Sequence, residues 1–402
     1  MADIIAFKGT RYNPEKIRKL SKVTAPPYDV ISREELERLY KMNRYNIVRP
    51  LLGKDLSGDS DKNNKYTRAA GYLRDWMEKE VLKRDKEDSV YINTQEFKVD
   101  GKVKKRIGFI ALLKLEEFDT KKSSVYPHEN TLSAPKEDRA KLIRATEANL
   151  GPVFAIYEDK DRSISSILKK VMSSKPLADI KDTNGVRNKF WRVSDRKITA
   201  ALCSAMKNKK LFIADGHHRY EVGLAFSKFK KDPKYGYILT YFTDLLGEGL
   251  VVLPYHRLIG GLDKGALSRL EDSLKKNFII EPVRSRKALK AFLAKAGKDE
   301  ARFVIYMRKK FMGLSFKGKK ELDVTIAKNL IIDPLDKIFI DFTKDLDYAI
   351  RKVNNHEFSF AILVNPVKIT EIRDVAFLGR RMPQKSTYFY PKVLTGLVIN
   401  VF

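Results

Sequence analysis

The sequence predicts an α+β protein with mixed sheets and helices and more than one domain. Its 402 residues exceed the length that one hydrophobic core usually fills. Apolar residues make up 43% of the chain, which is enough for packed cores and excludes disorder over most of the length. Segments with strand and helix periodicity follow one another without a regular βαβ repeat, which favours the α+β class.

The N-terminal part begins with a proline-rich stretch and a capped helix. TAPPYDVI is expected to be a strand broken by two prolines. A helix is expected over 32–44, because Ser32 can cap it and Glu35 follows three residues later, as in a capping box. Residues 66–82 carry apolar side chains at helical spacing, and Asp100-Gly101 predicts the turn of a hairpin between two strands.

In the middle of the chain, a helix is expected from Pro135 to about Asn149, with Gly151 past its end. The pattern of expected elements changes near residues 260–261, where shorter helices and strands begin to alternate. We therefore expect a main domain over 1–260 and a smaller α+β domain over 261–402. The other elements expected before residue 260 are strands at PVFAIY, NKFWRVSD, KKLFIAD, YGYILTYFTDL and GLVVLPYHRLI and helices at 163–175 and 195–207.

Charge and composition narrow the class of protein. The net charge of +29 would attract nucleic acid, polyphosphate or small phosphate substrates, but it would also fit a lysine-rich, heat-adapted proteome, because the basic residues are spread over the whole chain. The single cysteine, Cys203, excludes an internal disulfide and a thiolate metal site. No apolar run is long enough to cross a membrane, and no signal peptide is recognisable. We expect a cytoplasmic protein.

The motif IADGHHRYE places a buried-type strand before a glycine and a helix after it. Asp215 and Gly216 are then expected at the turn, and His217, His218 and Arg219 in the first helical turn. The N–H groups of a helix start attract anions, and histidine and arginine beside them would gather phosphate oxygens. The glycine lets backbone approach a ligand, and Asp215 could hold Mg²⁺ or accept a proton from a hydroxyl. The inner face of this helix is expected to carry Val222, Ala225, Phe226 and Phe229.

Two other interpretations of this turn are an ordinary helix cap by Asp215 and a zinc site. Neighbouring helical residues point about 100° apart, so His217 and His218 can hardly share one ion. The i,i+4 spacing of helical zinc sites is also absent. The combination of acid, glycine, histidines and arginine favours a functional role over a plain cap.

Other polar segments could complete a site assembled from distant parts of the chain. Four of the five histidines lie in such segments. Each also has a plainer interpretation: an exposed charged loop, a proline-braced strand, a packed histidine–arginine pair, or a Lys-Ser-Thr turn without the glycines of a P-loop. The candidates are Glu129 as general base with His128 beside it, Lys136 and Arg139 for phosphate, Tyr28 and Asp29, His256, and Lys385, Ser386 and Thr387.

Six ordered motifs, APPYDVI, PHENT, PKEDR, IADGHHRYE, PYHRLI and MPQKSTYFYPK, closely resemble a widespread prokaryotic family, the domain of unknown function numbered ten-fifteen. The resemblance covers nearly the whole chain. The DGHHR string is similar to the nucleotide-phosphate motif of the ParB/sulfiredoxin-like fold, and free serine kinases of that fold carry the same string. Those enzymes phosphorylate L-serine to O-phosphoserine with ADP, ATP or pyrophosphate and Mg²⁺.

The resemblance implies a ParB/sulfiredoxin-like core around DGHHR within 1–260, with the C-terminal tail of the smaller domain returning to the site. It implies Mg²⁺ as cofactor, held by Asp215, and L-serine with pyrophosphate or an adenine nucleotide as partners. The resemblance implies phosphate binding at 215–219 and Glu129 as the base. From the residues themselves we also expect phosphate at Lys136, Arg139 and 385–387, Asp215, His218 and Asp29 as further catalytic residues, and Tyr28, His128, Glu221 and His256 as substrate-binding residues.

A second class of function stays open at this point. A nucleotide-responsive DNA-binding or regulatory protein of the ParB-like fold would suit the net charge of +29. The sequence shows no basic recognition helix and no cluster of stacking aromatic residues, so nucleic acid is not an expected partner. A membrane is not expected either, because no apolar run is long enough to cross one. The sequence does not specify the oligomeric state.

Overall fold

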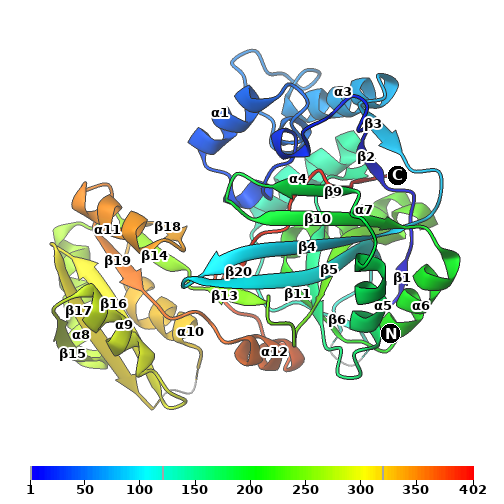
Figure 1. The fold of residues 1–402 in the computed structure, drawn as a ribbon. Helices are drawn as coiled ribbons and strands as arrows, with labels where there is room; N and C mark the ends of the chain where they lie inside the picture. The colour runs from blue at the N-terminus through cyan, green and yellow to red at the C-terminus, as the bar shows by residue number, and fades with distance from the viewer. Residues whose placement is uncertain (1, 120–121, 319–320) are drawn as a thin grey trace. The chain divides into compact units, whose positions relative to one another are not determined.

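The computed structural model describes residues 2–119, 122–318 and 321–402, which fold into two compact units. The first unit comprises Met1–Pro127, Thr131–Val251 and Pro391–Phe402, and the second comprises His128–Asn130 and Val252–Tyr390. Each unit combines helices with sheets (Figure 1), so the predicted α+β class is confirmed. In the described ranges, no helix is long and apolar enough to cross a membrane.

The first unit is built on a mixed sheet with the strand order β6-β11-β8-β12-β5-β4-β10-β9. The short strand β1 pairs with the last residues of β5. The hairpin predicted at Asp100-Gly101 is confirmed, because both residues have a positive φ between two antiparallel strands. The strands are β1 Ile4–Ile5, β4 Val90–Val99, β5 Lys102–Lys114, β6 Val125–Tyr126, β8 Val153–Tyr157, β9 Ala178–Lys181, β10 Arg187–Val193, β11 Leu211–Asp215 and β12 Tyr237–Asp244.

Helices and two short sheets complete the first unit. The N-cap predicted at Ser32 is confirmed, since its hydroxyl accepts from the Glu35 backbone at 3.2 Å. The helices are α1 Arg33–Met42, α2 Val48–Leu51, α3 Lys65–Glu78, α4 Ser133–Thr146, α5 Ser163–Met172, α6 Arg196–Met206, α7 His217–Lys230 and the 3-10 turns Leu20–Lys22, Tyr28–Val30 and Pro233–Gly236. The short sheets pair β2 Thr10–Tyr12 with β3 Leu82–Arg84, and β7 Ala148–Asn149 with β21 Asn400–Val401.

Three predicted elements are wrong in detail. TAPPYDVI was expected as a strand, but Tyr28–Val30 form a 3-10 turn after prolines that have no N–H for a sheet ladder. The helix expected to reach about Asn149 ends at Thr146, because Glu147 takes the left-handed conformation with φ 43°. The strand expected over GLVVLPYHRLI is divided at Pro254 into β13 Val251–Leu253 and β14 His256–Gly260.

The inner face of α7 also differs from the prediction. Val222 and Phe226 are buried, but Ala225 is exposed and Phe229 is 68% exposed. At Gly223 the helix lies so close to β12 that a Cβ would come within 2.8 Å of the Ile238 side chain. The buried face of α7 therefore includes Gly223, and Phe229 lies outside it.

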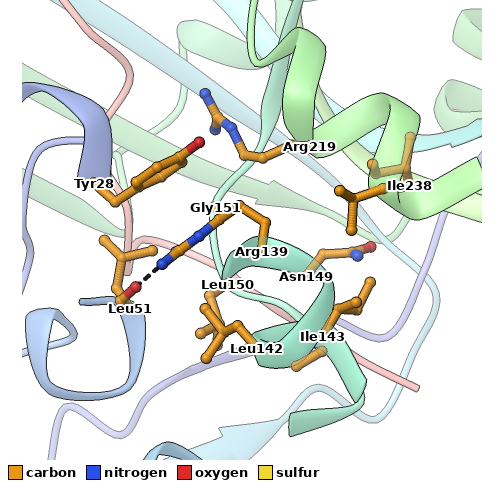
Figure 2. A pocket seen from close by; sticks show the side chains of 12 residues that line it. Tyr28, Leu51, Arg139, Leu142, Ile143, Asn149, Leu150, Gly151, Arg219 and Ile238 are labelled. Atoms are coloured by element: carbon orange, nitrogen blue, oxygen red, sulfur yellow. Dashed lines mark hydrogen bonds between the residues drawn. The ribbon is translucent and has the colours of Figure 1, made fainter. Parts of the chain in front are cut away.

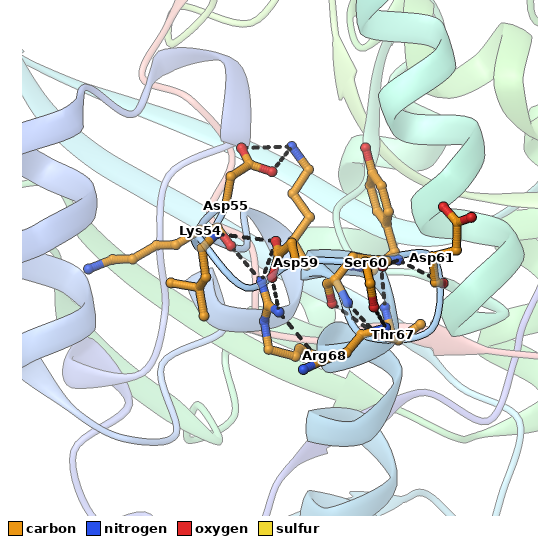
Figure 3. A network of polar contacts seen from close by, with 12 residues as sticks. Lys54, Asp55, Asp59, Ser60, Asp61, Thr67 and Arg68 are labelled. Atoms are coloured by element: carbon orange, nitrogen blue, oxygen red, sulfur yellow. Dashed lines mark hydrogen bonds and ion pairs between the residues drawn. The ribbon is translucent and has the colours of Figure 1, made fainter.

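The loop before α3 is fixed by hydrogen bonds to the first turns of that helix (Figure 3). Arg68 donates to the Lys54 carbonyl at 2.8 Å and to Asp59 at 2.9 Å. Asn64 caps α3 in a capping box with Thr67. These bonds hold the segment that follows α2 and lie close in the chain to Leu51, whose carbonyl takes part in the candidate site described below.

The second unit contains a sheet with the strand order β15-β17-β16-β19-β14-β18. Alternate residues point to opposite faces, so Ile259 packs against α8 and α10, whereas Leu258 packs against α9 and α11. The strands are β14, β15 Ile279–Val283, β16 Glu300–Met307, β17 Lys310–Lys317, β18 Phe339–Thr343, β19 Phe360–Leu363 and, outside this sheet, β20 Tyr388–Tyr390. The helices are α8 Lys264–Asn277, α9 Arg286–Ala294, α10 Asp323–Ala327, the π-helical turn Lys328–Ile332, α11 Leu346–Asn354 and α12 Ile369–Phe377.

The C-terminal segment stabilises the first unit through Ile399, which is 1% exposed in the core formed by α1, α2 and α3. Its backbone exchanges two hydrogen bonds of 2.9 Å with Thr10.

We predict that Ile399→Ala lowers the free energy of unfolding by about 2–4 kcal/mol, because it leaves a cavity. Urea unfolding measures this loss, and the control Val401→Ala, at a partly exposed position of β21, should cost less than about 1 kcal/mol. Equal stability of the two variants would contradict this packing.

Candidate functional site

A buried strand of the first unit ends at a corner that leads directly into a helix. β11 ends at Asp215, Gly216 is the N-cap, and α7 begins at His217. Gly216 has φ 89°, a conformation that favours glycine strongly over other residues. Gly216 has no side chain that could cap this helix start, and among the described residues no side-chain hydrogen bond is made by the N-cap position.

The Asp215 carboxylate is held by two cations from different parts of the chain. Arg219 Nη2 donates to one oxygen and Lys392 Nζ to the other. Arg219 also donates to the Pro152 carbonyl through Nη1. The three charged side chains are only 9–13% exposed, so these ion pairs are largely shielded from water.

Glycine at position 216 makes room for the side chain of Arg219. A Cβ at Gly216 would lie 2.9 Å from Arg219 Nε and 3.0 Å from Cζ, closer than real side-chain contacts. The guanidinium therefore folds back over the turn and reaches the carboxylate four residues earlier. This explains physically why acid, glycine and arginine occur together in the motif.

Arg106, on β5, is a third cation that sequence reasoning missed. It is 1% exposed, donates through Nε to Gln95 at 3.1 Å, and donates through Nη2 to the Pro391 carbonyl. Burial lowers the pKa of Arg106, and the negative charge of Asp215 acts in the opposite direction. Gln95 also donates to the Lys392 carbonyl at 3.0 Å, so it connects the two cations.

These charges leave the corner electropositive. Asp215 supplies one negative charge against the positive charges of Arg106, Arg219 and Lys392. Three buried donors or hydroxyls, Arg106 Nη1, Arg219 Nε and Thr395 Oγ1, have no hydrogen-bond partner within the described residues. Uncompensated buried charge is costly, so the arrangement favours binding of an anion.

A small cavity of about 50 Å³ borders Arg219 (Figure 2). The Arg139 guanidinium lies 4.1 Å from the centre of the Tyr28 ring and donates to the Leu51 carbonyl at 2.8 Å. Burial is the main cause that raises the pKa of Tyr28 to about 12, so its hydroxyl stays protonated at neutral pH. The cavity is lined by Tyr28, Leu51, Arg139, Leu142, Ile143, Ala148, Asn149, Leu150, Gly151, Arg219, Val222 and Ile238.

Gly151 brings two polar groups to the same part of this wall. A Cβ there would lie 3.0 Å from Thr395 Oγ1 and 3.6 Å from Arg219 Nη1. The absence of a side chain leaves space beside a guanidinium and a buried hydroxyl. At about 10–15 Å³ for each water, the cavity holds a few water molecules or one small anionic group.

Residues of α7 and the segment before α4 are joined by hydrogen bonds. His218 Nε2 accepts from the Leu132 backbone at 3.0 Å. Glu221 accepts from Thr131 at 2.7 Å and from Lys136 at 3.2 Å. Lys136, predicted to bind phosphate, is thus paired with Glu221 in this structure, and the two contacts fix the start of α4 against α7.

The predicted site residues fall into two groups. The first unit contains Tyr28, Asp29, Lys136, Arg139, Asp215, Gly216, His217, His218, Arg219 and Glu221. The second unit contains His128, Glu129, His256, Lys385, Ser386 and Thr387. In the first group Asp29 is exposed and His217 is buried. The roles predicted for both groups stay predictions.

Within the second unit, two distant motifs meet. His128 is buried, and its Nε2 atom lies 3.0 Å from Thr387 Oγ1. The backbone carbonyl of His128 accepts from the Met382 backbone N–H at 2.7 Å. Glu129 forms a parallel bridge with Met382. Ser386 donates to the Pro383 carbonyl at 2.5 Å. PHENT and MPQKST are therefore one structural element, although they lie far apart in the chain.

Asp215 does not fit the role of a resident Mg²⁺ ligand in this arrangement. Both of its oxygens accept from cations, whereas Mg²⁺ needs oxygen ligands that are open to it. In the part of the chain that the structure describes, no group of three or more His, Cys, Asp or Glu residues could hold a metal ion.

The family model described as "Protein of unknown function (DUF1015)" matches residues 4–337, and the chain belongs to this family. No curated protein matches the chain. The structural comparison supplies more distant likenesses. A conserved hypothetical protein from Pyrococcus furiosus has 14% identity and a TM-score of 0.41, with 72% of this chain and 98% of that chain covered.

Two further solved structures are similar at the same low level. A free serine kinase in complex with AMP has 12% identity and a TM-score of 0.40, with 68% of this chain and 89% of that chain covered. SbnI with C-terminal truncation from Staphylococcus aureus has 9% identity and a TM-score of 0.43, with 73% and 87% covered. At these identities and TM-scores, the likenesses carry no conclusion about what this chain binds or does.

The corner can be tested with a pair of glycine variants. Gly216→Ala and Gly101→Ala both force alanine into a positive φ, and each should cost about 1 kcal/mol or more of stability. A Cβ meets Arg219 only at Gly216, since nothing lies within 4 Å of Gly101. We predict that Gly216→Ala alone weakens pyrophosphate binding, by at least tenfold, in calorimetric titration. Equal affinity in both variants would refute the role of Arg219 placement.

The lowered pKa of His256 leads us to predict that the stability of the second unit depends on pH. Burial, followed by the charge of Arg257, lowers its pKa from 6.5 to about 4, and its Nδ1 accepts from the Val364 backbone at 3.3 Å. The unfolded chain takes up a proton near pH 6.5 while the folded chain stays neutral to about pH 4. Stability present above pH 6.5 is therefore lost as the pH falls through this window, by about 3 kcal/mol. Urea unfolding at a series of pH values should show a smaller slope for His256→Gln, and an identical slope would contradict the assignment.

Proposed function

We propose that the chain is a small-molecule kinase that phosphorylates the hydroxyl of free L-serine to O-phosphoserine, with pyrophosphate, or ADP or ATP, as phosphoryl donor. The observation that carries the proposal is the buried excess of positive charge at the Asp215 corner. We also propose that the sheet and helix around this corner form a ParB/sulfiredoxin-like core. The support for that core is the DGHHR string, similar to the one that free serine kinases carry.

The corner suits a phosphoryl group for electrostatic reasons. Arg219 and Lys392 are already directed at a carboxylate, and phosphate oxygens can take the place of carboxylate oxygens with the same donors. The start of α7 adds the positive end of a helix dipole. In the transfer step these groups would stabilise the charge on the equatorial oxygens of the moving phosphoryl.

The reaction needs a base for the serine hydroxyl. The hydroxyl oxygen attacks phosphorus, the bond from phosphorus to the bridging oxygen breaks, and phosphate leaves when pyrophosphate is the donor. A carboxylate accepts the hydroxyl proton. Asp29 belongs to the first unit and follows Tyr28, whose ring lines the cavity, while Glu129 belongs to the second unit. Both stay candidates, and Mg²⁺ would enter with the donor phosphates rather than through a resident site at Asp215.

Pyrophosphate is our first choice of donor, because the contacts that we propose are all to phosphate oxygens. The cavity of about 50 Å³ that borders Arg219 is too small to be a pocket for an adenine base. Pyrophosphate needs no pocket for a base, whereas ADP or ATP would require one. ADP and ATP remain the alternative donors, which a direct comparison of rates separates.

We predict that the purified chain, with Mg²⁺ and L-serine, forms phosphoserine from at least one of pyrophosphate, ADP and ATP. Arg219→Ala should reduce kcat/KM by at least about 10²-fold, because it removes a charge-assisted contact to the donor. Glu129→Gln should preserve donor binding and lower kcat if Glu129 is the base, and Asp29→Asn tests the other candidate. Phosphoserine formation is measured by mass spectrometry.

The matched control for this experiment is Arg187→Ala. Arg187 is a half-exposed arginine of the first unit that pairs with Asp179 at 2.7 Å, on β10 and β9. Its loss should leave kcat/KM within about twofold, since exposed ion pairs contribute little. No phosphoserine with any donor would refute the proposed function, and equal rates for Arg219→Ala and Arg187→Ala would refute the site.

A further inference from the structure

Arg257 is a buried cation at the centre of the sheet in the second unit. It lies on β14, where its neighbours across the sheet are Phe342 on β18 and Ile362 on β19. The residue is 2% exposed, and its Nη1 donates to the Tyr255 carbonyl at 3.0 Å. Arginine is rarely buried to this degree unless it is paired with an acid.

The structure supplies no acid for this guanidinium. Among the described residues, the bond to Tyr255 is its one hydrogen bond and no carboxylate forms an ion pair with it. A guanidinium carries five N–H donors, and in the described residues a protein oxygen accepts only from its Nη1. Burial lowers the pKa of Arg257 to about 10, so the group is still charged at neutral pH.

One lysine lies beside the residue that accepts from Arg257. Lys385 Nζ is 5.6 Å from the centre of the Tyr255 ring. The neighbouring acid that acts on His256 is Asp345, and its carboxylate already accepts from the Tyr348 backbone as the N-cap of α11.

Arg302, in the same sheet, is a largely buried arginine that is paired with an acid. It lies on β16 with its side chain 13% exposed, and it pairs with Glu300 at 3.0 Å while its guanidinium carbon lies 4.7 Å from the Phe292 ring. The sheet can therefore bury an arginine with a counter-charge. Arg257 differs because its counter-charge is not part of the described protein.

We propose that Arg257 binds the anionic group, a carboxylate or a phosphate, of a small ligand in the second unit. A buried charge without a counter-charge is unfavourable, and an anion with two oxygens in the plane of the guanidinium compensates it through paired charge-assisted hydrogen bonds. The proposal does not rest on the kinase function, because the Asp215 corner contributes none of these residues. It changes the expectation for PYHRLI from a packed histidine–arginine pair to a binding element.

The experiment measures the thermal unfolding midpoint of the full chain against inorganic phosphate, sodium acetate and L-serine in separate titrations at constant ionic strength. Each titration is repeated for Arg257→Met, Arg257→Lys and the control Arg302→Met, all in the Arg219→Ala background. That background weakens anion binding at the Asp215 corner, and any response that remains there is common to the Arg257 and Arg302 variants. Failure of this proposal is therefore distinguishable from failure of the kinase proposal.

We expect at least one of the anions to raise the midpoint in the Arg219→Ala background and in Arg302→Met. Arg257→Met should weaken that effect by at least tenfold while the midpoint without anion stays equal or rises, since a buried unpaired charge has been removed. Arg257→Lys keeps the charge and should weaken the response less. A response to phosphate alone assigns the ligand group as phosphate, and a response to acetate or L-serine assigns a carboxylate. An unchanged response in both Arg257 variants, or no response to any of the three, overturns the proposal.

Discussion

The candidate site of the first unit depends on one interaction, the pairing of Asp215 with Arg219 and Lys392. It joins the end of β11, the first turn of α7 and the C-terminal segment, and Gln95 extends the connection to Arg106 on β5. The ion pairs of Asp215 hold these segments together. One carboxylate does not balance the three positive charges, so the corner still attracts a further anion. A phosphoryl group could use the same donors without a large rearrangement.

The two most deeply buried arginines of the two units illustrate how positive charge is retained inside this protein. Arg106 is solvated by an amide, a carbonyl and the faces of Phe154 and Tyr241. Arg257 has a single carbonyl. Neither forms an ion pair with an acid in the described residues, although the charge of Asp215 acts on Arg106, so both hold positive charge where water screens it little. The net charge of +29 could not reveal this, because it counts charges without their positions.

Sequence reasoning succeeded where the signal is local. The cap at Ser32, the hairpin turn at Asp100-Gly101 and the α+β class follow from neighbouring residues, and the structure confirms them. It failed at Arg106, which lies in an ordinary strand pattern and acquires its partners 11 and 285 residues away. Lys392 stood in a recognised motif, but its contact with Asp215 spans 177 residues and no periodicity encodes such a contact. On α7, the buried face includes Gly223, which lies against Ile238, and the apolar pattern did not predict that Phe229 would be exposed.

The central claim is that an anion binds at the Asp215 corner. The most direct measurement is a crystal structure of the full chain grown with pyrophosphate and Mg²⁺. The account predicts phosphate oxygens about 2.7–3.1 Å from nitrogens of Arg219, Lys392 and the first backbone N–H groups of α7. Pyrophosphate bound elsewhere, with Asp215 still paired to both cations and no density at the start of α7, would contradict it.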